Sequence, residues 1–198
     1  MEFQQVVDRR RMVRRYSAEP VDPTVVERIL GNALHAPSAG FSQGWAFLLL
    51  DTPDDLERFW AAATPDEDGL DSWLAGMRTA PVIIVPMSCK RAYLERYAEP
   101  DKGWTDLDET HWPVPYWDID TGMAALLMLQ TVVDAGLGAC FFGIAPAQVA
   151  GFREAFAVPE DYMPIGAVSV GHRAPDLRSP SLRRGRRPVE EVVHRGRW

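Results

Sequence analysis

The chain lacks the short motifs by which several large enzyme classes are recognised. Its 198 residues contain no Gly-x-Gly-x-x-Gly or Walker A loop and no His-Glu-x-x-His pair, and its four histidines are scattered. The sequence therefore gives little support for ATP use or for metal-dependent catalysis. We predict no metal site.

Cysteines, long apolar runs and excess positive charge are scarce as well. Cys89 and Cys140 have neither metal-ligand spacing nor the number that a disulfide framework needs, which favours reduced thiols and a cytoplasmic protein. No apolar stretch reaches bilayer length, and the first residues contain no apolar signal segment, so no membrane association is expected. A formal net charge of -7 argues against nucleic acid as a partner.

Hydrophobic side chains are abundant enough for one substantial core, and we treat residues 1–198 as a single domain. Helical spacing and strand-like apolar runs alternate irregularly, which predicts an α+β fold with a central sheet flanked by helices. The expected helices span 2–11, 22–36, 53–63, 69–79, 117–138 and 145–156, and the expected strands span 45–51, 80–87, 139–144 and 163–172. Asp22 and Pro23 suit a helix start, and the helix from 117 is apolar on most faces and should end at Gly136 or Gly138.

Residues 95–117 are polar, rich in Trp, Tyr and Pro, and without clear periodicity. Irregular segments of this length are often functional arms or lids. We expect an inserted arm or lid at about 90–117. A surface excursion packed by its own aromatic rings is the equal alternative.

Two basic clusters stand out in this acidic chain. Near the N-terminus, Arg10, Arg11 and Arg14 lie within about one helical turn, so two of them could share a helix face. Near the C-terminus, Arg184 and Arg186 alternate as in an extended segment and should project to one side. Guanidinium groups suit phosphate, so the two clusters either converge on one anion or are separate solvated surfaces.

A third segment, HAPSAGFSQGW, follows the second expected helix. Its small residues would let backbone approach a ligand, and Ser38 and Gln43 offer hydrogen bonds. The same residue pattern is also typical of a simple connection between a helix and a strand.

Taken in order, RRMVRRYSAEPV, APSAGFSQGW, GMAALLMLQTVVDAGLGACFFGI and VSVGHRAP…RRGRRPVEEVV resemble the FMN-dependent nitroreductase family from end to end. The resemblance implies a mostly antiparallel sheet flanked by helices, in a domain-entwined homodimer with FMN as cofactor. It also implies a ping-pong reaction, in which NADH or NADPH passes hydride through flavin N5 to an electron-poor acceptor such as a nitroaromatic or a quinone.

The resemblance assigns roles to particular positions. Arg10, Arg184 and Arg186 would hold the FMN phosphate and ribityl end, and Arg14 would face the pyrimidine edge. Residues 37–39 of the partner subunit would reach the flavin. Phe142 and Gly143 would lie beside the flavin ring, where a backbone N–H could reach N5. The full set of implied cofactor-binding residues is Arg10, Arg11, Met12, Arg14, Pro37, Ser38, Ala39, Phe41, Gln43, Phe142, Gly143, Arg184 and Arg186.

The acceptor side is less defined. Trp104, Trp112 and Tyr116 could cover the flavin with Trp117, and His111 could offer a polar contact. Phe41 could line the same pocket. Packing within a dimer arm is the alternative for these rings.

Three positions depart from the family pattern: Met12 replaces a Ser, Phe41 an Asn and Gly44 a Pro. These changes keep two other functions open. One is a dimeric protein that only binds flavin, or has lost it. The other is an oxidoreductase with a deazaflavin donor.

Overall fold

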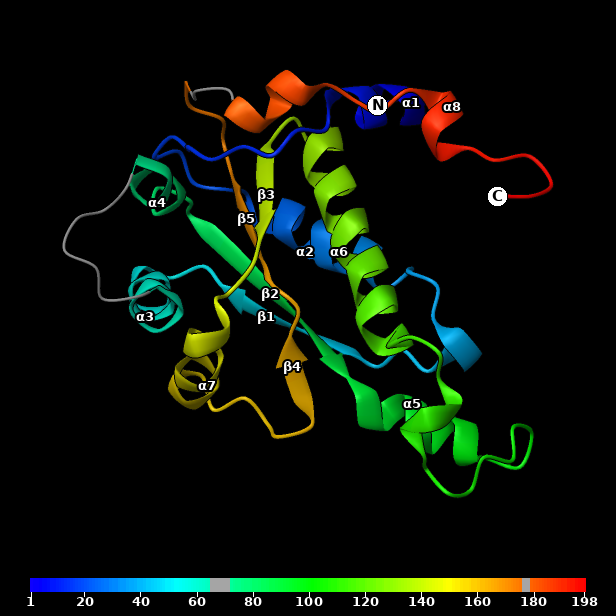
Figure 1. Ribbon diagram of the computed structural model, residues 1–198. Helices are drawn as coiled ribbons and strands as arrows, with labels where there is room; N and C mark the ends of the chain where they lie inside the picture. The colour runs from blue at the N-terminus through cyan, green and yellow to red at the C-terminus, as the bar shows by residue number, and fades with distance from the viewer. Residues whose placement is uncertain (65–71, 176–178) are drawn as a thin grey trace.

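An antiparallel sheet forms the centre of the protein, whose computed structural model describes residues 1–64, 72–175 and 179–198. The strands are β1 (Trp45–Leu50), β2 (Val82–Cys89), β3 (Gly138–Phe142), β4 (Tyr162–Pro164) and β5 (Ala167–Gly171). The sheet order is β1-β2-β5-β3, and β4 pairs with the far half of β2 (Figure 1). Every strand pair is antiparallel, so the predicted α+β class is confirmed.

Helices cover both faces of this sheet. Helices α2 and α6 lie on one face, and α3, α4 and α7 lie on the other (Figure 1). The helices are α1 (Phe3–Arg9), α2 (Pro23–Ala33), α3 (Pro53–Ala63), α4 (Ser72–Met77), α5 (Lys90–Ala98), α6 (Tyr116–Asp134), α7 (Pro146–Ala155) and α8 (Val189–Val192). Three short 3₁₀ helices, η1 (Ala39–Phe41), η2 (Glu109–His111) and η3 (Pro180–Arg184), complete the described part.

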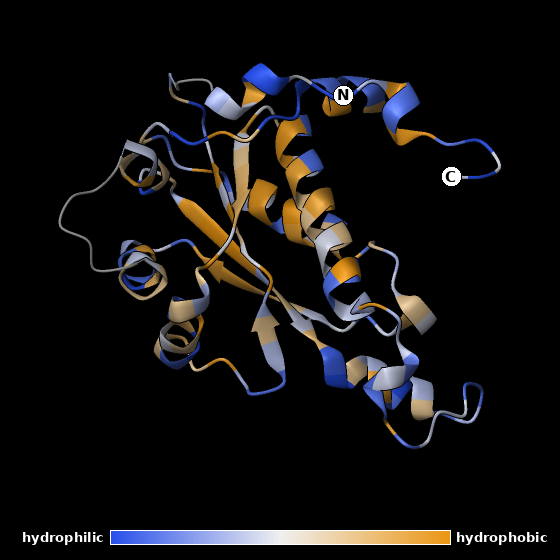
Figure 2. Ribbon diagram, in the orientation of Figure 1, coloured by the Kyte–Doolittle hydropathy of each residue, from blue (hydrophilic) through white to orange (hydrophobic). Residues whose placement is uncertain are grey.

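Strand β2 divides two hydrophobic cores by simple alternation. Val82 and Ile84 face the core under α2 and α6, whereas Ile83 and Val85 face the core under α3 and α7. All residues of β2 are buried. Figure 2 shows the consequence, because the apolar colour is concentrated in β2 and α6, while η3 is largely hydrophilic and α8 is mixed.

The predicted strand 163–172 is two strands, which corrects the sequence-based expectation. Gly166 separates β4 from β5 with φ 151, and a Cβ there would lie 2.7 Å from the Phe142 carbonyl oxygen. Pro86 of β2 sits opposite this break. Its carbonyl oxygen accepts from Ile165 N–H at 3.1 Å, so its own nitrogen faces the same gap and no ladder bond is lost.

The predicted helix ends are confirmed at two places. Asp22 caps α2 by accepting from Thr24 N–H at 2.8 Å, with Pro23 in the first turn. Helix α6 ends before Gly136, which has φ 79, and the Leu137 N–H returns to the Val132 carbonyl.

Helix α6 differs from the expectation of burial on most faces. A stripe at three- and four-residue spacing is exposed by 36–46%, made up of Tyr116, Ile119, Met123 and Leu126. The face toward the sheet is buried as predicted, but the opposite stripe is apolar and uncovered. Within the described ranges, no helix is both long and apolar enough for a bilayer crossing.

The segment 95–117 is more regular than its sequence indicated. Helix α5 runs over Lys90–Ala98, η2 follows, and α6 begins at Tyr116. The sequence signal for α5 was weak because Tyr93 is its only buried residue. We call residues 99–115, between these two helices, the arm.

Candidate functional site

Arg10, Arg11 and Arg14 do not lie on a helix, which corrects the predicted arrangement. Helix α1 ends at Arg9, and Arg10 has extended dihedral angles of φ −61 and ψ 120. The chain then runs beside β3, where Val13 N–H donates to the Ala139 carbonyl at 2.8 Å. Val13 is buried, so its burial and this bond outweigh the helical preference of the arginine run.

The structure brings the two basic clusters of the sequence to one pocket, here called the basic pocket. Its volume is about 290 Å³. The lining residues are Arg10, Arg11, Met12, Arg14, Ser179, Ser181, Leu182 and Arg186. Four guanidinium groups and two hydroxyls line it, and no carboxylate does so among the described residues. This donor set fits a phosphate group.

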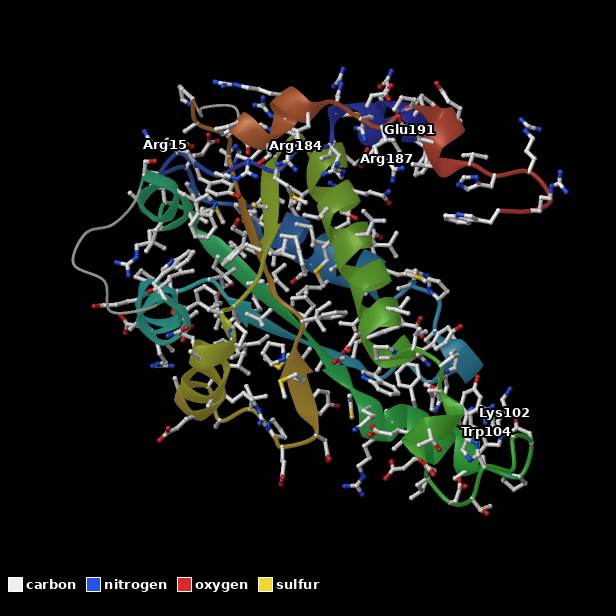
Figure 3. All side chains as sticks on the ribbon, in the orientation of Figure 1. Arg15, Lys102, Trp104, Arg184, Arg187 and Glu191 are labelled. Carbon is white, nitrogen blue, oxygen red and sulfur yellow. The ribbon has the colours of Figure 1, made fainter. Side chains whose placement is uncertain are left out.

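Arg184 and Arg186 are not alternating residues of an extended strand, which is a second correction. Arg184 closes the 3₁₀ helix η3, and Gly185 turns the chain with φ 68. As a result Arg186 lines the basic pocket, whereas Arg184 is not among its lining residues. Figure 3 shows Arg184 at the end of the molecule where the N-terminal and C-terminal segments meet.

Arg173 is a further cation near this region that the sequence analysis missed. It is half-buried, and its Nε–H donates to the Leu137 carbonyl at 3.0 Å. Burial lowers the pKa of Arg173, and the positive charges of Arg11 and Arg9 lower it further. An anion in the basic pocket would relieve this repulsion. No motif marks Arg173, because a single Arg after a strand has many uses.

Two implied flavin contacts are engaged in the protein itself. The Met12 sulfur accepts from Phe141 N–H at 3.4 Å, and the Met12 side chain packs against both cores. The Phe142 ring stacks on Trp60 with 5.7 Å between centroids and meets Trp73 edge-on. Backbone groups, and the exposed Gly143, are therefore what this strand end can offer to a ligand.

The small-residue loop before β1 has an unusual backbone. Gly40, Phe41 and Gln43 have positive φ values of 60, 55 and 48. Gln43 N–H donates to Ser38 Oγ at 3.0 Å, which closes the loop. Phe41 is 74% exposed, and Pro37 is exposed as well, so both can meet another molecule. We call residues 37–43 the η1 loop.

The end of the η1 loop and the residue after it form the string Gly40-Phe41-Ser42-Gln43-Gly44, which matches the pattern of a serine nucleophile elbow. Its context differs from that motif. The segment precedes a strand instead of following one, and Ser42 Oγ donates to the Ala39 carbonyl at 2.7 Å. The string is therefore not a hydrolase signature here.

The replacement of Pro by Gly at position 44 has a packing reason. A Cβ on Gly44 would lie 2.5 Å from the Tyr93 ring and 2.8 Å from the Cys89 carbonyl oxygen. The backbone of Gly44 also accepts from Cys89 N–H at 2.8 Å.

The predicted acceptor-side rings of the arm pack on one another. Trp112 lies at the centre, with its ring 4.5 Å from Tyr97, 5.6 Å from Trp104 and 5.6 Å from Tyr116. His111 stacks against Trp104 at 4.9 Å, and its Nε2 lies 2.9 Å from Asp106. The same contact holds the pKa of the Asp106 carboxyl below its ordinary value. The rings of the arm therefore pack on one another and on rings of α5 and α6. Its role as a lid stays a prediction.

The basic pocket and the arm lie at opposite ends of one chain. Figure 3 places Arg184 and Arg187 at one end, with Lys102 and Trp104 at the other. The η1 loop lies on the side of the arm, because Arg96 of α5 donates to the Gly40 carbonyl. A single chain therefore does not bring the η1 loop or the arm to the basic pocket. Among the residues whose structure is described, no group of His, Cys, Asp and Glu could hold a metal ion.

Known proteins resemble this chain over nearly its whole length. A protein of Methanothermobacter thermautotrophicus with the provisional name NADH dehydrogenase/NAD(P)H nitroreductase is 25% identical over 177 residues, which cover 88% of this chain and 78% of that protein. A solved nitroreductase family protein of Clostridium difficile has a TM-score of 0.75 and 20% identity, covering 100% of both chains.

A second solved structure, from Desulfovibrio desulfuricans, is described as a provisional nitroreductase in complex with FMN. It has a TM-score of 0.73 and 24% identity, covering 100% of this chain and 98% of that one. The profile of the Nitroreductase family matches residues 7–172, a range that includes four of the basic-pocket residues, the η1 loop and the arm. The chain therefore belongs to the nitroreductase family.

Proposed function

We propose that this protein is an FMN-dependent oxidoreductase that uses reduced nicotinamide to reduce an electron-poor acceptor in two alternating half-reactions. The observation that carries the proposal is the basic pocket, where arginines from both ends of the chain converge and no carboxylate of the described residues contributes to the lining. Relatives named as nitroreductases, and a fold neighbour crystallised with FMN, support the same conclusion. FMN, when bound, supplies the hydride chemistry.

The protein's own residues bind and orient. Arg10 and Arg186 hold the phosphate through charge-assisted hydrogen bonds, assisted by the hydroxyls of Ser179 and Ser181. Arg14, whose Nη1 donates to the Met12 carbonyl at 3.4 Å, adds positive charge to the same pocket. Hydride transfer needs no side-chain acid or base. The residues of the pocket need only orient the flavin ring and exclude water.

We propose further that the site is completed by a second copy of the chain. The exposed stripe of α6 supplies an apolar face, and the C-terminal residues present more apolar surface: Val189, Val192, Val193 and the 99% exposed Trp198. Exposed apolar groups in such number mark an interaction surface. In such a homodimer the partner's η1 loop and arm would border the flavin, which would unite the groups that one chain keeps apart.

Half-reaction kinetics test this function. The FMN-loaded protein is mixed anaerobically with NADH or NADPH, and the loss of visible flavin absorbance is followed; a nitroaromatic or a quinone is then added. We expect bleaching by one or both nicotinamides, return of the absorbance with the acceptor, and parallel lines in double-reciprocal plots. A protein that binds FMN but is bleached by neither nicotinamide would contradict this donor and favour a deazaflavin or a binding role.

A further inference from the structure

The η1 loop holds an exposed aromatic ring in a conformation that its residues disfavour. Phe41 and Gln43 both adopt left-handed backbone, although neither is a residue type that does so readily. Phe41 nevertheless points its ring into solvent, with 74% of the residue exposed, so burial of its own side chain does not explain the geometry. Such strain persists only where surrounding contacts hold it.

The first of these contacts comes from helix α6. Asp120 is 4% exposed, and its Oδ2 accepts from Ala39 N–H at 2.8 Å and from the Tyr93 hydroxyl at 2.9 Å. No described cation lies within ion-pair distance of this carboxylate. A buried carboxylate is costly unless it is hydrogen-bonded, and here the two bonds fasten the loop to α6 and α5.

The second contact comes from helix α5. Arg96 Nε–H donates to the Gly40 carbonyl at 2.9 Å, and Arg96 is itself held by a two-pronged pair with Asp101 at 2.7 and 2.8 Å. The Tyr97 ring fills the space where a Cβ on Gly40 would fall, at 2.6 Å. The arm thus supports the η1 loop through Arg96 and Asp101, in addition to packing its own rings.

We propose that Asp120 and Arg96 are positioning residues that hold Phe41 in place as a specificity-determining residue for the acceptor. The proposal rests on the proposed function, in which the η1 loop borders the flavin of the partner subunit. Neither residue touches the basic pocket, so they act only through the loop. Because both bonds to Asp120 fall on one oxygen, an Asn at this position can make the same two bonds.

Proteolysis of the FMN-free protein tests the fastening independently of any activity. Chymotrypsin cuts after exposed aromatic residues, and the cut after Phe41 can be quantified by mass spectrometry. A hydrogen bond to a charged group stabilises the closed η1 loop, so Asp120→Ala should increase the fraction of molecules in which the loop is open. Cleavage after Phe41 should then rise about ten- to a hundredfold. Asp120→Asn should stay within a few-fold of the unaltered protein.

Matched variants keep the experiment decisive. Asp118→Ala, two residues away on α6, removes a bond to Ser88 instead of the loop and should leave cleavage at Phe41 unchanged. If Asp120→Ala does not fold, Arg96→Gln and Tyr93→Phe each remove one fastening bond and should raise cleavage by a smaller factor. Cleavage at the unaltered rate in all of them, or Asp120→Asn behaving like Asp120→Ala, would overturn the proposal.

Acceptor kinetics test the link to specificity. Asp120→Ala should raise KM for a bulky acceptor about tenfold more than for a small one, with kcat little changed. In a background of Phe41→Ala, the same substitution should add nothing to this discrimination, because the residue that it positions is gone. Additive effects would refute the specificity role. Failure to reduce any acceptor would instead refute the proposed function and leave the proteolysis result standing.

Discussion

Arg186 and Arg184 form a natural pair for testing the basic pocket, because both are exposed arginines at the C-terminal cluster and only Arg186 lines the pocket. Replacement of Arg186 by Gln removes one guanidinium while a polar side chain remains. A hydrogen bond to a charged group contributes about 1.5–3 kcal/mol. Since Arg186 is exposed to solvent, we take the lower limit, about 1.5 kcal/mol, which corresponds to a roughly tenfold rise in the Kd for FMN.

The half-buried Arg10 should matter more. Arg10→Gln is expected to raise the Kd toward the upper part of the same range, about a hundredfold. Flavin fluorescence quenching at low salt measures the constants, with Arg184→Gln as the control that stays within about twofold. The difference in the Kd for FMN between the unaltered protein and Arg186→Gln should become smaller at high ionic strength, because exposed charges are screened. Equal losses in the Arg184 and Arg186 variants would refute the assignment of Arg186.

Three further predictions concern the η1 loop and its neighbours. Gly44→Ala should lower the unfolding free energy by about 1–3 kcal/mol in urea denaturation, since its Cβ would lie 2.5 Å from the Tyr93 ring; no loss would show that the loop relaxes freely. Burial, and then the bond to Asp120, raise the pKa of Tyr93 above 10.0, so stability should fall as pH rises above about 10, where only the unfolded chain loses this proton. Tyr93→Phe should remove this fall in the unfolding free energy with pH. If the variant loses stability above about pH 10 as steeply as the unaltered protein, Tyr93 is not its cause. Phe41→Asn should raise the unfolding free energy by up to about 1 kcal/mol, because Asn tolerates left-handed backbone, and should alter the acceptor profile; an unaltered profile would exclude Phe41 from the acceptor site.

The sequence predicts the secondary structure well where burial and spacing coincide. Val82–Val85 are buried on both faces of the sheet, and the turn chemistry of Asp22 and Gly136 marks helix ends locally. Helix α5 was not predicted, because its contacts are made by polar and aromatic side chains without an apolar period. The break at Gly166 depends on the approach of Phe142, a long-range contact that no local pattern records.

The basic pocket shows a similar division. Residue types singled out Arg10 and Arg186, and both line the pocket. Their backbone geometry was mispredicted, because pairing of the N-terminal segment with β3 and the turn at Gly185 override local propensity. Asp120 carried no signal at all, since its role depends on the η1 loop lying more than 70 residues away in sequence.

Titration of the purified protein with FMN, followed by visible absorbance, tests the central claim most directly. The account predicts a saturable yellow complex with one flavin per chain, weakened in Arg10→Gln and Arg186→Gln and unaffected in Arg184→Gln. A protein that remains colourless at saturating FMN, or that binds flavin equally well without Arg10 and Arg186, would contradict it.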